Sequence, residues 1–327
     1  MEKPLRIGVL GAGHLGRIHV QQLKELTDYE IVGIHDPHPE KAGGVQAEFG
    51  VPVLDDMAAL IAASEVVDVV TPTVAHHACA MQALGAGRHV FIEKPIAQTL
   101  DQARELVERS AAVGRLVQVG HVERFNPAFL AARPMLDSPM FIETHRLAQF
   151  DPRGTDVSVV LDLMIHDLDI ILDVVDAPVE EVHASGVAVV SDTPDISNAR
   201  ISFSNGCVAN LTASRISMKK MRKSRFFQKD AYIAVDMLKK EAEIMRMRTV
   251  AEADPFAVTL DLGPGKGLRE ISFDKPAIPA TNAIREELRS FAKAIRAGGT
   301  PAVTAADGLA ALELAHRVLA AMDIRRT

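Results

Sequence analysis

The stretch Arg6-Ile7-Gly8-Val9-Leu10-Gly11-Ala12-Gly13-His14-Leu15-Gly16 decides the fold. Its apolar first half, residues 6–10, predicts a strand, and apolar residues at helical spacing begin at Leu15. The glycines Gly11, Gly13 and Gly16 permit a tight turn, a close approach of backbone N–H groups to a pyrophosphate, and close packing of helix on strand. The helix N-terminus adds partial positive charge. We therefore predict that Gly11, Gly13, His14, Leu15 and Gly16 form a dinucleotide-binding turn.

An acidic residue follows at the spacing that such a turn requires. Asp36 ends the second predicted strand, twenty residues after Gly16. Its carboxylate can accept hydrogen bonds from the adenosine ribose hydroxyls and repels a 2′-phosphate, which favours NAD over NADP. His35 and His38 flank Asp36, and as cations they would favour NADP instead.

The first 120 residues alternate short β-branched runs with helical patterns, which is typical of βαβ units and a parallel sheet. The predicted strands are residues 6–10, 30–35, 66–71, 89–93 and 116–120. The predicted helices are residues 15–25, 38–49, 57–63, 75–85 and 100–113.

Beyond residue 121 the rhythm changes to strands in succession, which predicts an antiparallel sheet. Strands are expected over residues 140–149, 180–190, 198–203 and 207–214, and helices over residues 157–175, 284–297 and 305–322. We predict an α/β chain with two domains: a Rossmann doubly wound parallel sheet (residues 1–121) and an α+β domain with an open sheet (residues 122–327). The C-terminal helices, residues 284–322, are able to pack back on the first domain.

Composition excludes several classes of protein. Apolar residues make up 48% of the 327 residues, which is typical of a globular protein. The net charge of −7 gives no global field for nucleic acid, so no nucleic-acid partner is expected. No run approaches the roughly 20 apolar residues of a membrane helix. The N-terminal apolar run is too short for a signal peptide, and two cysteines cannot build a disulfide framework, so a cytoplasmic location is expected.

Three further motifs carry a family resemblance. They are Glu93-Lys94-Pro95 at the end of a predicted parallel strand, Thr71-Pro72-Thr73 followed by His76, and Asp162-Leu163-Met164-Ile165-His166. Together with the glycine turn, they make the chain similar to the Gfo/Idh/MocA oxidoreductases over essentially its whole length. Segments 120–127, 164–169 and 223–228 most resemble the members that act on C3 of UDP-N-acetylglucosamine.

The resemblance implies a large, mostly antiparallel C-terminal sheet that mediates a homodimer or homotetramer. It also implies NAD(P)-dependent oxidation of hydroxyl groups of sugars and cyclitols. The substrate would be a small-molecule sugar or nucleotide sugar. Thr71, Pro72, His76, Glu93 and Lys94 would line the cofactor site, although His76 could equally cap its helix.

Oxidation of a secondary alcohol needs a group that holds the hydroxyl and a base that takes its proton. Pro95 interrupts the strand ladder, so Lys94 is expected at the carboxyl-terminal rim where ligands bind in open α/β folds. The resemblance implies that Lys94 binds the reacting hydroxyl and helps transfer its proton, and that Glu93 positions Lys94. The alternative is an exposed lysine at the end of a strand.

Asp162, His166 and Asp169 are spaced i, i+4 and i+7, which predicts one stripe of a helix. The resemblance implies that His166 is the base, that Asp162 binds a substrate hydroxyl, and that Asp169 orients its neighbours. A metal site is a competing interpretation, but a third cluster of ligands is lacking, and no metal is predicted. A solvated acidic face is the other alternative.

Three residues after the fifth strand are further candidates for substrate binding. His121, Arg124 and Asn126 should emerge on the same rim, where Arg124 could hold a diphosphate or carboxylate by a bidentate contact. Asn126 could bind a sugar hydroxyl or cap the next helix, whose first turn would begin at Pro127.

The segment Lys219-Lys220-Met221-Arg222-Lys223-Ser224-Arg225 concentrates five positive charges on an acidic chain. For a nucleotide sugar it is a candidate route for the diphosphate. A solvated sheet edge protected by lysines is the alternative. The function predicted overall is NAD-dependent oxidation of C3 of UDP-N-acetylglucosamine. The alternatives are a free-sugar or inositol dehydrogenase, and a non-catalytic NAD-binding regulator.

Overall fold

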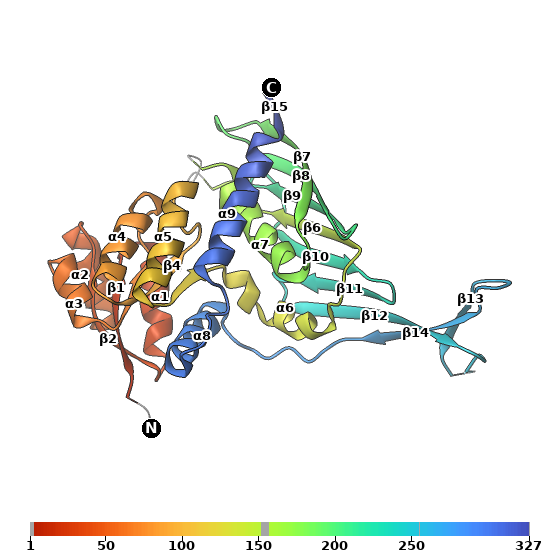
Figure 1. Cartoon of the computed structure of the whole chain (residues 1–327), viewed down its shortest axis with the longest axis horizontal. Helices are drawn as coiled ribbons and strands as arrows, with labels where there is room; N and C mark the ends of the chain where they lie inside the picture. The colour runs from red at the N-terminus through yellow and green to blue at the C-terminus, as the bar shows by residue number, and fades with distance from the viewer. Residues whose placement is uncertain (1–2, 152–156, 255, 327) are drawn as a thin grey trace. The chain divides into compact units, whose positions relative to one another are not determined.

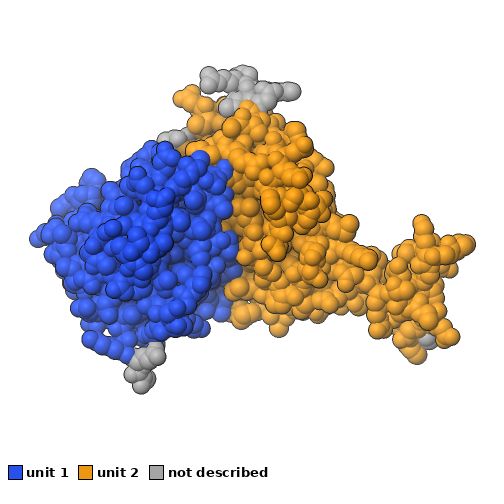
Figure 2. All heavy atoms as spheres, viewed as in Figure 1, with its two compact units in different colours: residues 1–125, 281–313 blue, residues 126–280, 314–327 orange. Residues whose placement is uncertain are grey.

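The computed structural model describes residues 3–151, 157–254 and 256–326. The chain divides into two compact units (Figure 2). Unit 1 comprises residues 1–125 and 281–313, and unit 2 comprises residues 126–280 and 314–327.

Unit 1 is built on a parallel sheet with helices beside it (Figure 1). The strand order of this sheet is β2-β1-β3-β4-β5. Its strands are β1 (Leu5–Leu10), β2 (Tyr29–His35), β3 (Val66–Val69), β4 (His89–Glu93) and β5 (Val117–Gly120). Its helices are α1 (His14–Lys24), α2 (Pro39–Phe49), α3 (Met57–Ala63), α4 (Thr73–Gly85), α5 (Leu100–Val113), the 3₁₀ turn η1 (Val122–Phe125) and α8 (Ala283–Ala297). The five predicted strands are confirmed. Because β2 and β3 flank β1 on opposite sides, the order in which strands are added to the sheet reverses at β1, and ligands bind beside such a point at the carboxyl ends of the strands.

One prediction about β3 is wrong in its boundary. We expected the strand to continue to Thr71, but it ends at Val69. Pro72 precedes the first residue of α4 and is its N-cap. Proline cannot donate to the sheet ladder, and its ring favours the start of a helix, so the chain leaves the sheet earlier than the apolar run suggests.

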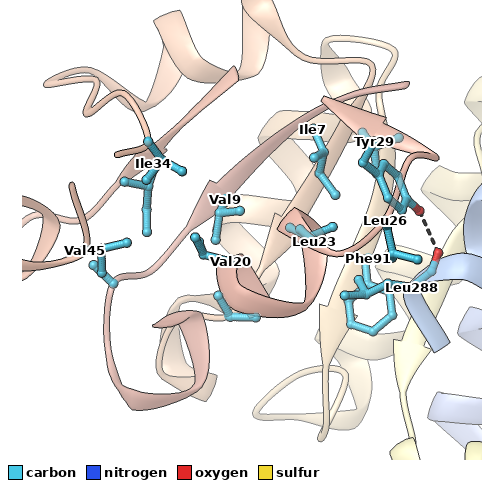
Figure 3. Close-up of a cluster of buried hydrophobic side chains, with 14 of the residues drawn as sticks. Ile7, Val9, Val20, Leu23, Leu26, Tyr29, Ile34, Val45, Phe91 and Leu288 are labelled. Atoms are coloured by element: carbon cyan, nitrogen blue, oxygen red, sulfur yellow. Dashed lines mark hydrogen bonds between the residues drawn. The ribbon is translucent and has the colours of Figure 1, made fainter. Parts of the chain in front are cut away.

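The core of unit 1 joins segments far apart in sequence. Ile7, Val20 and Phe91 are fully buried together with Leu288 and Phe291 of α8 (Figure 3). The hydroxyl of Tyr29 donates to the carbonyl of Leu288 across 2.8 Å, which satisfies its polar atom inside the core. Helix α8 therefore packs into the core of unit 1.

Unit 2 contains a ten-stranded sheet among the described residues, in the order β13-β14-β12-β11-β10-β6-β9-β8-β7-β15. The strands are β6 (Phe141–Leu147), β7 (Val179–Ala188), β8 (Ile196–Phe203), β9 (Val208–Ser214), β10 (Met221–Phe227), β11 (Ala231–Asp236), β12 (Glu241–Val250), β13 (Val258–Asp261), β14 (Leu268–Asp274) and β15 (Met322–Arg326). All neighbouring pairs in this sheet are antiparallel except β6–β9 and β7–β15. The predicted α/β architecture with a large, mostly antiparallel second sheet is confirmed.

One face of this sheet is buried, and buried and exposed side chains accordingly alternate along its strands. In β6, Ile142, Thr144 and Arg146 are buried while their neighbours are half-exposed. The short helical elements that contact the sheet are α6 (Pro127–Ala132), the π turn η3 (Val160–Met164) and α7 (Ile165–Val174), and the 3₁₀ turn η2 (Arg133–Met135) follows α6. Helix α9 (Ala305–Ala320) contains the boundary between the residues of unit 1 and those of unit 2. We call the covered side the inner face.

The predicted regular helix over residues 157–175 is wrong in its first half. Residues 160–164 form a π turn, and only residues 165–174 are α-helical. The N–H of Val159 donates to the carbonyl of Pro194, and the N–H of Val160 donates to Ser158 Oγ. These contacts fix the start of the segment from outside the helix, which the sequence spacing alone cannot reveal.

Candidate functional site

The glycine turn between β1 and α1 is packed tightly at two glycines and open at the third. Gly11 has φ +109°, and a Cβ there would lie 2.6 Å from the carbonyl oxygen of Val70. A Cβ on Gly16 would lie 2.0 Å from the carbonyl oxygen of Gly11. At Gly13, by contrast, a Cβ would meet no heavy atom within 4 Å. The turn thus leaves space at the position where a pyrophosphate approaches the backbone.

The residues at the start of α1 supply no side chain that would cap the helix, so its first N–H groups can accept an anion as their partner. Gly13 is the N-cap and offers no side chain to the first turn, which also lacks an acidic residue. The exposed His14 and half-buried Leu15 follow. Since the first N–H groups of a helix need an outside acceptor, these residues fit the phosphate oxygens of a dinucleotide.

Asp36 connects the end of β2 to the glycine turn. Its Oδ2 accepts a hydrogen bond from the Ala12 N–H at 2.8 Å, and its Oδ1 accepts one from the His38 N–H at 2.9 Å. Each carboxylate oxygen has a second lone pair, so both can still accept a hydroxyl. The carboxylate therefore orders the turn and fits a ribose at the same time.

His76 joins the ends of two neighbouring strands instead of capping α4. Its ring nitrogens lie 2.9 Å from the carbonyl oxygens of Thr71 and Pro95. Burial lowers the pKa of His76 despite these two acceptors, so the neutral ring donates to one carbonyl at a time. Pro72, between Thr71 and α4, is exposed. The arrangement fixes the loop that carries Lys94 relative to α4.

A buried chain of three charged residues lies behind Lys94. His19 Nδ1 is 3.0 Å from Asp68 Oδ2, and His19 Nε2 is 3.1 Å from Glu93 Oε1. All three residues are buried. Burial alone would lower the pKa of His19, but the two carboxylates outweigh it and raise that pKa well above its ordinary value. His19 is therefore an imidazolium that donates to both acids, and we call the three residues the buried triad.

The triad holds the carboxylate that contacts the backbone of Lys94. The N–H of Lys94 donates to Glu93 Oε2 at 3.1 Å, while Glu93 Oε1 faces His19. On the other side, a Cβ on Gly120 would lie 2.7 Å from Glu93 Oε1. The glycine that ends β5 therefore leaves the room that the Glu93 carboxylate occupies. Lys94 itself is half-buried.

The three candidate residues after β5, His121, Arg124 and Asn126, differ in burial and in their hydrogen bonds. His121 is 1% exposed, and its carbonyl accepts from the N–H of Arg124, a half-buried residue in η1. Asn126 Oδ1 accepts from the Ala128 N–H at 3.1 Å, and its Nδ2 donates to the Met237 carbonyl at 3.0 Å. Asn126 therefore caps α6, which is one of the two roles that the sequence left open.

In unit 2, Asp162 lies within the π turn, and His166 is the second residue of α7. The expected i, i+4 relationship of a regular α-helix is wrong for this pair, because a π turn has more residues per turn than an α-helix. Asp162 and His166 are half-buried, whereas Asp169 is 1% exposed. Turns of this type often mark functional positions in helices.

The neighbour of His166 carries an ion pair that the sequence did not indicate. Arg146 of β6 donates to Asp167 through Nε at 2.9 Å and through Nη2 at 2.8 Å. Both side chains are 4% exposed. This bidentate pair fixes the start of α7 on the inner face of the sheet.

Sequence reasoning missed His19 and Asp68 as well as Arg146. The signal for the triad was present, since Asp68 interrupts an apolar run that predicts a strand covered on both faces. A buried acid needs a partner. Arg146 and Asp167 carry no comparable local signal, because their pairing depends on the placement of α7 on the sheet.

No group of three or more His, Cys, Asp or Glu side chains is arranged to hold a metal ion in residues 3–151, 157–254 and 256–326. Within the same ranges, no helix has the length and apolar content to cross a bilayer.

The fold and the glycine turn define a dinucleotide-binding protein of the Rossmann class. Residues 5–121 match the GFO_IDH_MocA description "Oxidoreductase family, NAD-binding Rossmann fold", and residues 101–228 match the "GFO/IDH/MocA C-terminal domain". A UDP-N-acetylglucosamine 3-dehydrogenase of Acidithiobacillus ferrooxidans is 39% identical over 235 residues, which are 72% of this chain and 74% of that protein. The chain belongs to the Gfo/Idh/MocA family of oxidoreductases.

Solved structures and other relatives agree with this membership. A crystal form of the Acidithiobacillus enzyme superposes with a TM-score of 0.86 and 32% identity, covering 98% of both chains. An inositol 2-dehydrogenase of Rubrobacter xylanophilus is 31% identical over 193 residues, which are 56% of each chain. The relatives include enzymes named for a nucleotide sugar and for a cyclitol.

Proposed function

We propose that this protein is an NAD-dependent dehydrogenase that oxidises the C3 hydroxyl of UDP-N-acetylglucosamine to the 3-keto nucleotide sugar. The assignment of the substrate is supported by the 39% identical relative named for that reaction, which matches 72% of this chain. The inositol 2-dehydrogenase, at 31% identity over 56% of the chain, favours a cyclitol as the second candidate.

The cofactor site of the proposal lies at the carboxyl ends of the unit 1 strands. Gly11, Gly13 and Gly16 would hold the pyrophosphate with the N-terminus of α1, while His14 and Leu15 line the turn. Asp36 would accept the ribose hydroxyls and so select NAD over NADP. Thr71, Pro72, His76 and Glu93 would line the nicotinamide half. When bound, the cofactor accepts the hydride that the alcohol carbon loses.

Residues of this chain would accept the proton that the alcohol loses. Lys94 would donate a hydrogen bond to the reacting oxygen and stabilise its developing negative charge. His166 would take the hydroxyl proton, and Asp162 would hold a hydroxyl of the sugar. His121 and Arg124 are further candidates for substrate contacts. Asn126 is a weaker candidate, because both of its polar side-chain atoms already make hydrogen bonds in the α6 cap.

The buried triad would be a positioning device for Lys94. Its support is the continuous path from Asp68 through His19 and Glu93 to the Lys94 N–H, at 3.0, 3.1 and 3.1 Å. A carboxylate held from one side by an imidazolium presents its other oxygen in one orientation. The triad would thereby fix the backbone of Lys94 through the hydrogen bond to its N–H.

The test is to incubate the protein with NAD and each of three alcohols, UDP-N-acetylglucosamine, N-acetylglucosamine and myo-inositol, and to follow NADH absorbance. We expect turnover with the nucleotide sugar and a kcat/KM at least about tenfold higher than with either neutral compound, a difference of about 1.4 kcal/mol. Preferential oxidation of myo-inositol would establish the second candidate instead. NADH formation with none of the three would contradict both.

The proposal also includes a cytoplasmic location and a homo-oligomer formed through the unit 2 sheet. Both cysteines are free, Cys79 in unit 1 and Cys207 in unit 2, which suits a reducing compartment. On β13 and β14, large apolar side chains are exposed, including Val258 and Phe273. Exposed apolar patches of this kind support an association surface.

A further inference from the structure

A buried carboxylate, Asp195, closes the loop between β7 and β8. Its Oδ2 accepts hydrogen bonds from three consecutive backbone N–H groups, those of Val189 at 2.7 Å, Val190 at 2.7 Å and Ser191 at 3.1 Å. Its Oδ1 accepts one from the Ser191 hydroxyl at 2.7 Å. Asp195 is 0% exposed, so these donors replace the water that the carboxylate loses. The loop is thereby held around one side chain.

The same hydrogen bonds keep Asp195 ionised beside a cation. Burial by itself raises the pKa of the Asp195 carboxyl, but the donors from Val190 and Ser191 outweigh it, so the pKa lies below its ordinary value. Arg215, the residue after β9, has its Nε 3.8 Å from Asp195 Oδ1, and both side chains are almost fully buried. The Arg215 N–H also donates to the Asp195 carbonyl at 2.9 Å. We call Asp195 and Arg215 the loop clamp.

The loop clamp holds the start of the π turn at two points. Arg215 Nη2 donates to the carbonyl of Val157. The carbonyl of Pro194, the residue before Asp195, accepts a hydrogen bond from the N–H of Val159 at 3.3 Å. Residues 157–159 are therefore fixed by groups of two other segments, the loop after β7 and the end of β9.

The peptide group between Ser158 and Val159 connects the loop clamp to Asp162. Its N–H donates to the Pro194 carbonyl, and its carbonyl oxygen accepts the N–H of Asp162 at 3.0 Å. Because a peptide group is planar and rigid, a shift at one of these hydrogen bonds moves the other. The backbone position of Asp162 therefore depends on where Pro194 lies, and the loop of Pro194 is held by Asp195.

We propose that Asp195 and Arg215 are positioning residues for the reaction, which fix the peptide group of residues 158–159 and, through it, the place of the Asp162 carboxylate. The proposal rests on the proposed function, in which Asp162 holds a hydroxyl of the sugar and His166 takes the proton. The loop clamp acts at the start of the π turn, whereas the ion pair between β6 and α7 acts at its end.

The first test measures the backbone of the π turn in the absence of substrate. Amide hydrogen exchange at Asp162 is compared among the unmodified protein, D195A and D236A. Asp236 is a matched control because it is also a largely buried carboxylate of unit 2. It accepts the Lys239 N–H at 3.0 Å and lies 3.2 Å from Lys223 Nζ, so it too combines a backbone donor with a cation.

We expect D195A to lower the protection of the Asp162 amide by at least about tenfold, while the amides of β6 keep theirs within about threefold. D236A should leave the Asp162 amide within the same threefold limit. Thermal melting verifies that each variant folds. R215K, which keeps the buried charge but loses the guanidinium contact with Val157, replaces D195A if that variant does not fold. Unchanged protection of the Asp162 amide in the clamp variant would overturn the proposal.

The second test determines whether the loop clamp acts through Asp162. The kcat/KM for UDP-N-acetylglucosamine is measured for D195A, D162A and the double variant. We expect D195A to lower kcat/KM by at least about tenfold alone but by less than about threefold in the D162A background, because effects that act through one group are not additive. D236A should change kcat/KM by less than about threefold in both. An equal loss from D195A in both backgrounds would show a general structural effect and overturn the positioning role.

The two proposals fail in different ways. Oxidation of UDP-N-acetylglucosamine by the unmodified protein, with unchanged exchange at Asp162 in D195A, would remove the positioning role and leave the proposed function intact. Loss of protection at Asp162 in D195A, combined with no oxidation of UDP-N-acetylglucosamine by the unmodified protein, would leave the loop clamp and remove the proposed function.

Discussion

At the scale of single residues, the most unusual feature of unit 1 is an imidazolium enclosed by two acids. Enclosed ion pairs are poor sources of stability when compared with apolar residues of the same size, but the removal of one partner is costly. His19 is 0% exposed, and both of its ring nitrogens are engaged. Its protonation therefore links the stability of unit 1 to pH.

The first prediction concerns His19→Gln. Because the pKa of His19 is raised in the folded protein, the stability it contributes is fully present below its unfolded pKa of about 6.5. This contribution to stability is lost as pH rises through the raised pKa of His19 in the folded protein. We expect the variant to lose about 3–5 kcal/mol of unfolding free energy at pH 6, with a smaller difference from wild type at pH 9. Urea unfolding at both pH values measures this.

His89→Gln is the matched control for His19. Burial and the nearby Arg115 lower the pKa of His89 to about 4, so this ring is already neutral throughout that range. The control should show a difference from wild type that is constant between pH 7 and pH 9, whereas the difference for His19→Gln, measured at pH 7 as well, should already fall over that interval. A pH-independent loss in His19→Gln as well would show that His19 is not held as a cation.

Lys94 is tested by its own truncation. Because Lys94 is proposed to act on the reacting oxygen, Lys94→Ala should lower kcat by about 10²- to 10⁴-fold. It should leave the Kd for NAD within a few fold, since the glycine turn and Asp36 are untouched. Steady-state kinetics measure kcat and calorimetric titration with NAD measures the Kd, with the exposed Lys41→Ala as the control. Wild-type turnover in Lys94→Ala would refute the assigned role.

At the scale of secondary-structure elements, the junctions at strand ends set the chemistry of unit 1. Asp36, at the end of β2, contacts the turn between β1 and α1 through the Ala12 N–H. We expect Asp36→Ala to weaken NAD binding more than NADP binding, because the ribose acceptor and the repulsion of a 2′-phosphate are both lost. Titration with both cofactors gives the ratio, and an unchanged preference would contradict the ribose contact.

The π turn before α7 offers a second prediction at this scale. Deleting Leu161 removes the extra residue, so residues 159–174 can continue as a regular helix, and the angle about the helix axis between Asp162 and His166 changes as the turn tightens from π to α geometry. We expect kcat to fall by at least about tenfold with a melting temperature near that of Leu161→Ala, which keeps the chain length. Full activity in the deletion variant would show that the turn has no functional role.

At the scale of the whole molecule, the sequence was most informative where structure depends on local contacts. The glycine turn and the five parallel strands follow from short-range patterns of glycine and apolar residues, and the Asn126 cap was one of two roles that the local spacing allowed. The π turn could not be predicted, because it depends on contacts that Ser158 and Pro194 make at its start. The alternation of Arg222 and Lys223 onto opposite faces of the sheet could not be predicted either, because no strand was expected over residues 221–227.

The proposed oligomer gives the prediction at this scale. Figure 1 shows β13 and β14 extending from the rest of the unit 2 sheet, and Phe256 and Phe273 are 98% and 71% exposed. If this arm contributes to association, replacing both phenylalanines by serine should lower the mass measured by light scattering from that of a dimer or tetramer. Val74→Ser, at an exposed position of unit 1, is the control. A monomeric wild-type protein would contradict the prediction.

Gly120, the glycine that ends β5, is a position where a small added side chain would displace the proposed catalytic lysine. A single methyl group at Gly120 would collide with Glu93 Oε1 at 2.7 Å, and the displaced carboxylate would carry the Lys94 N–H with it. Gly120→Ala would thus misplace Lys94 while leaving every charged side chain of the cofactor turn unaltered. Such a variant offers a way to trap an enzyme that binds both ligands but turns over slowly.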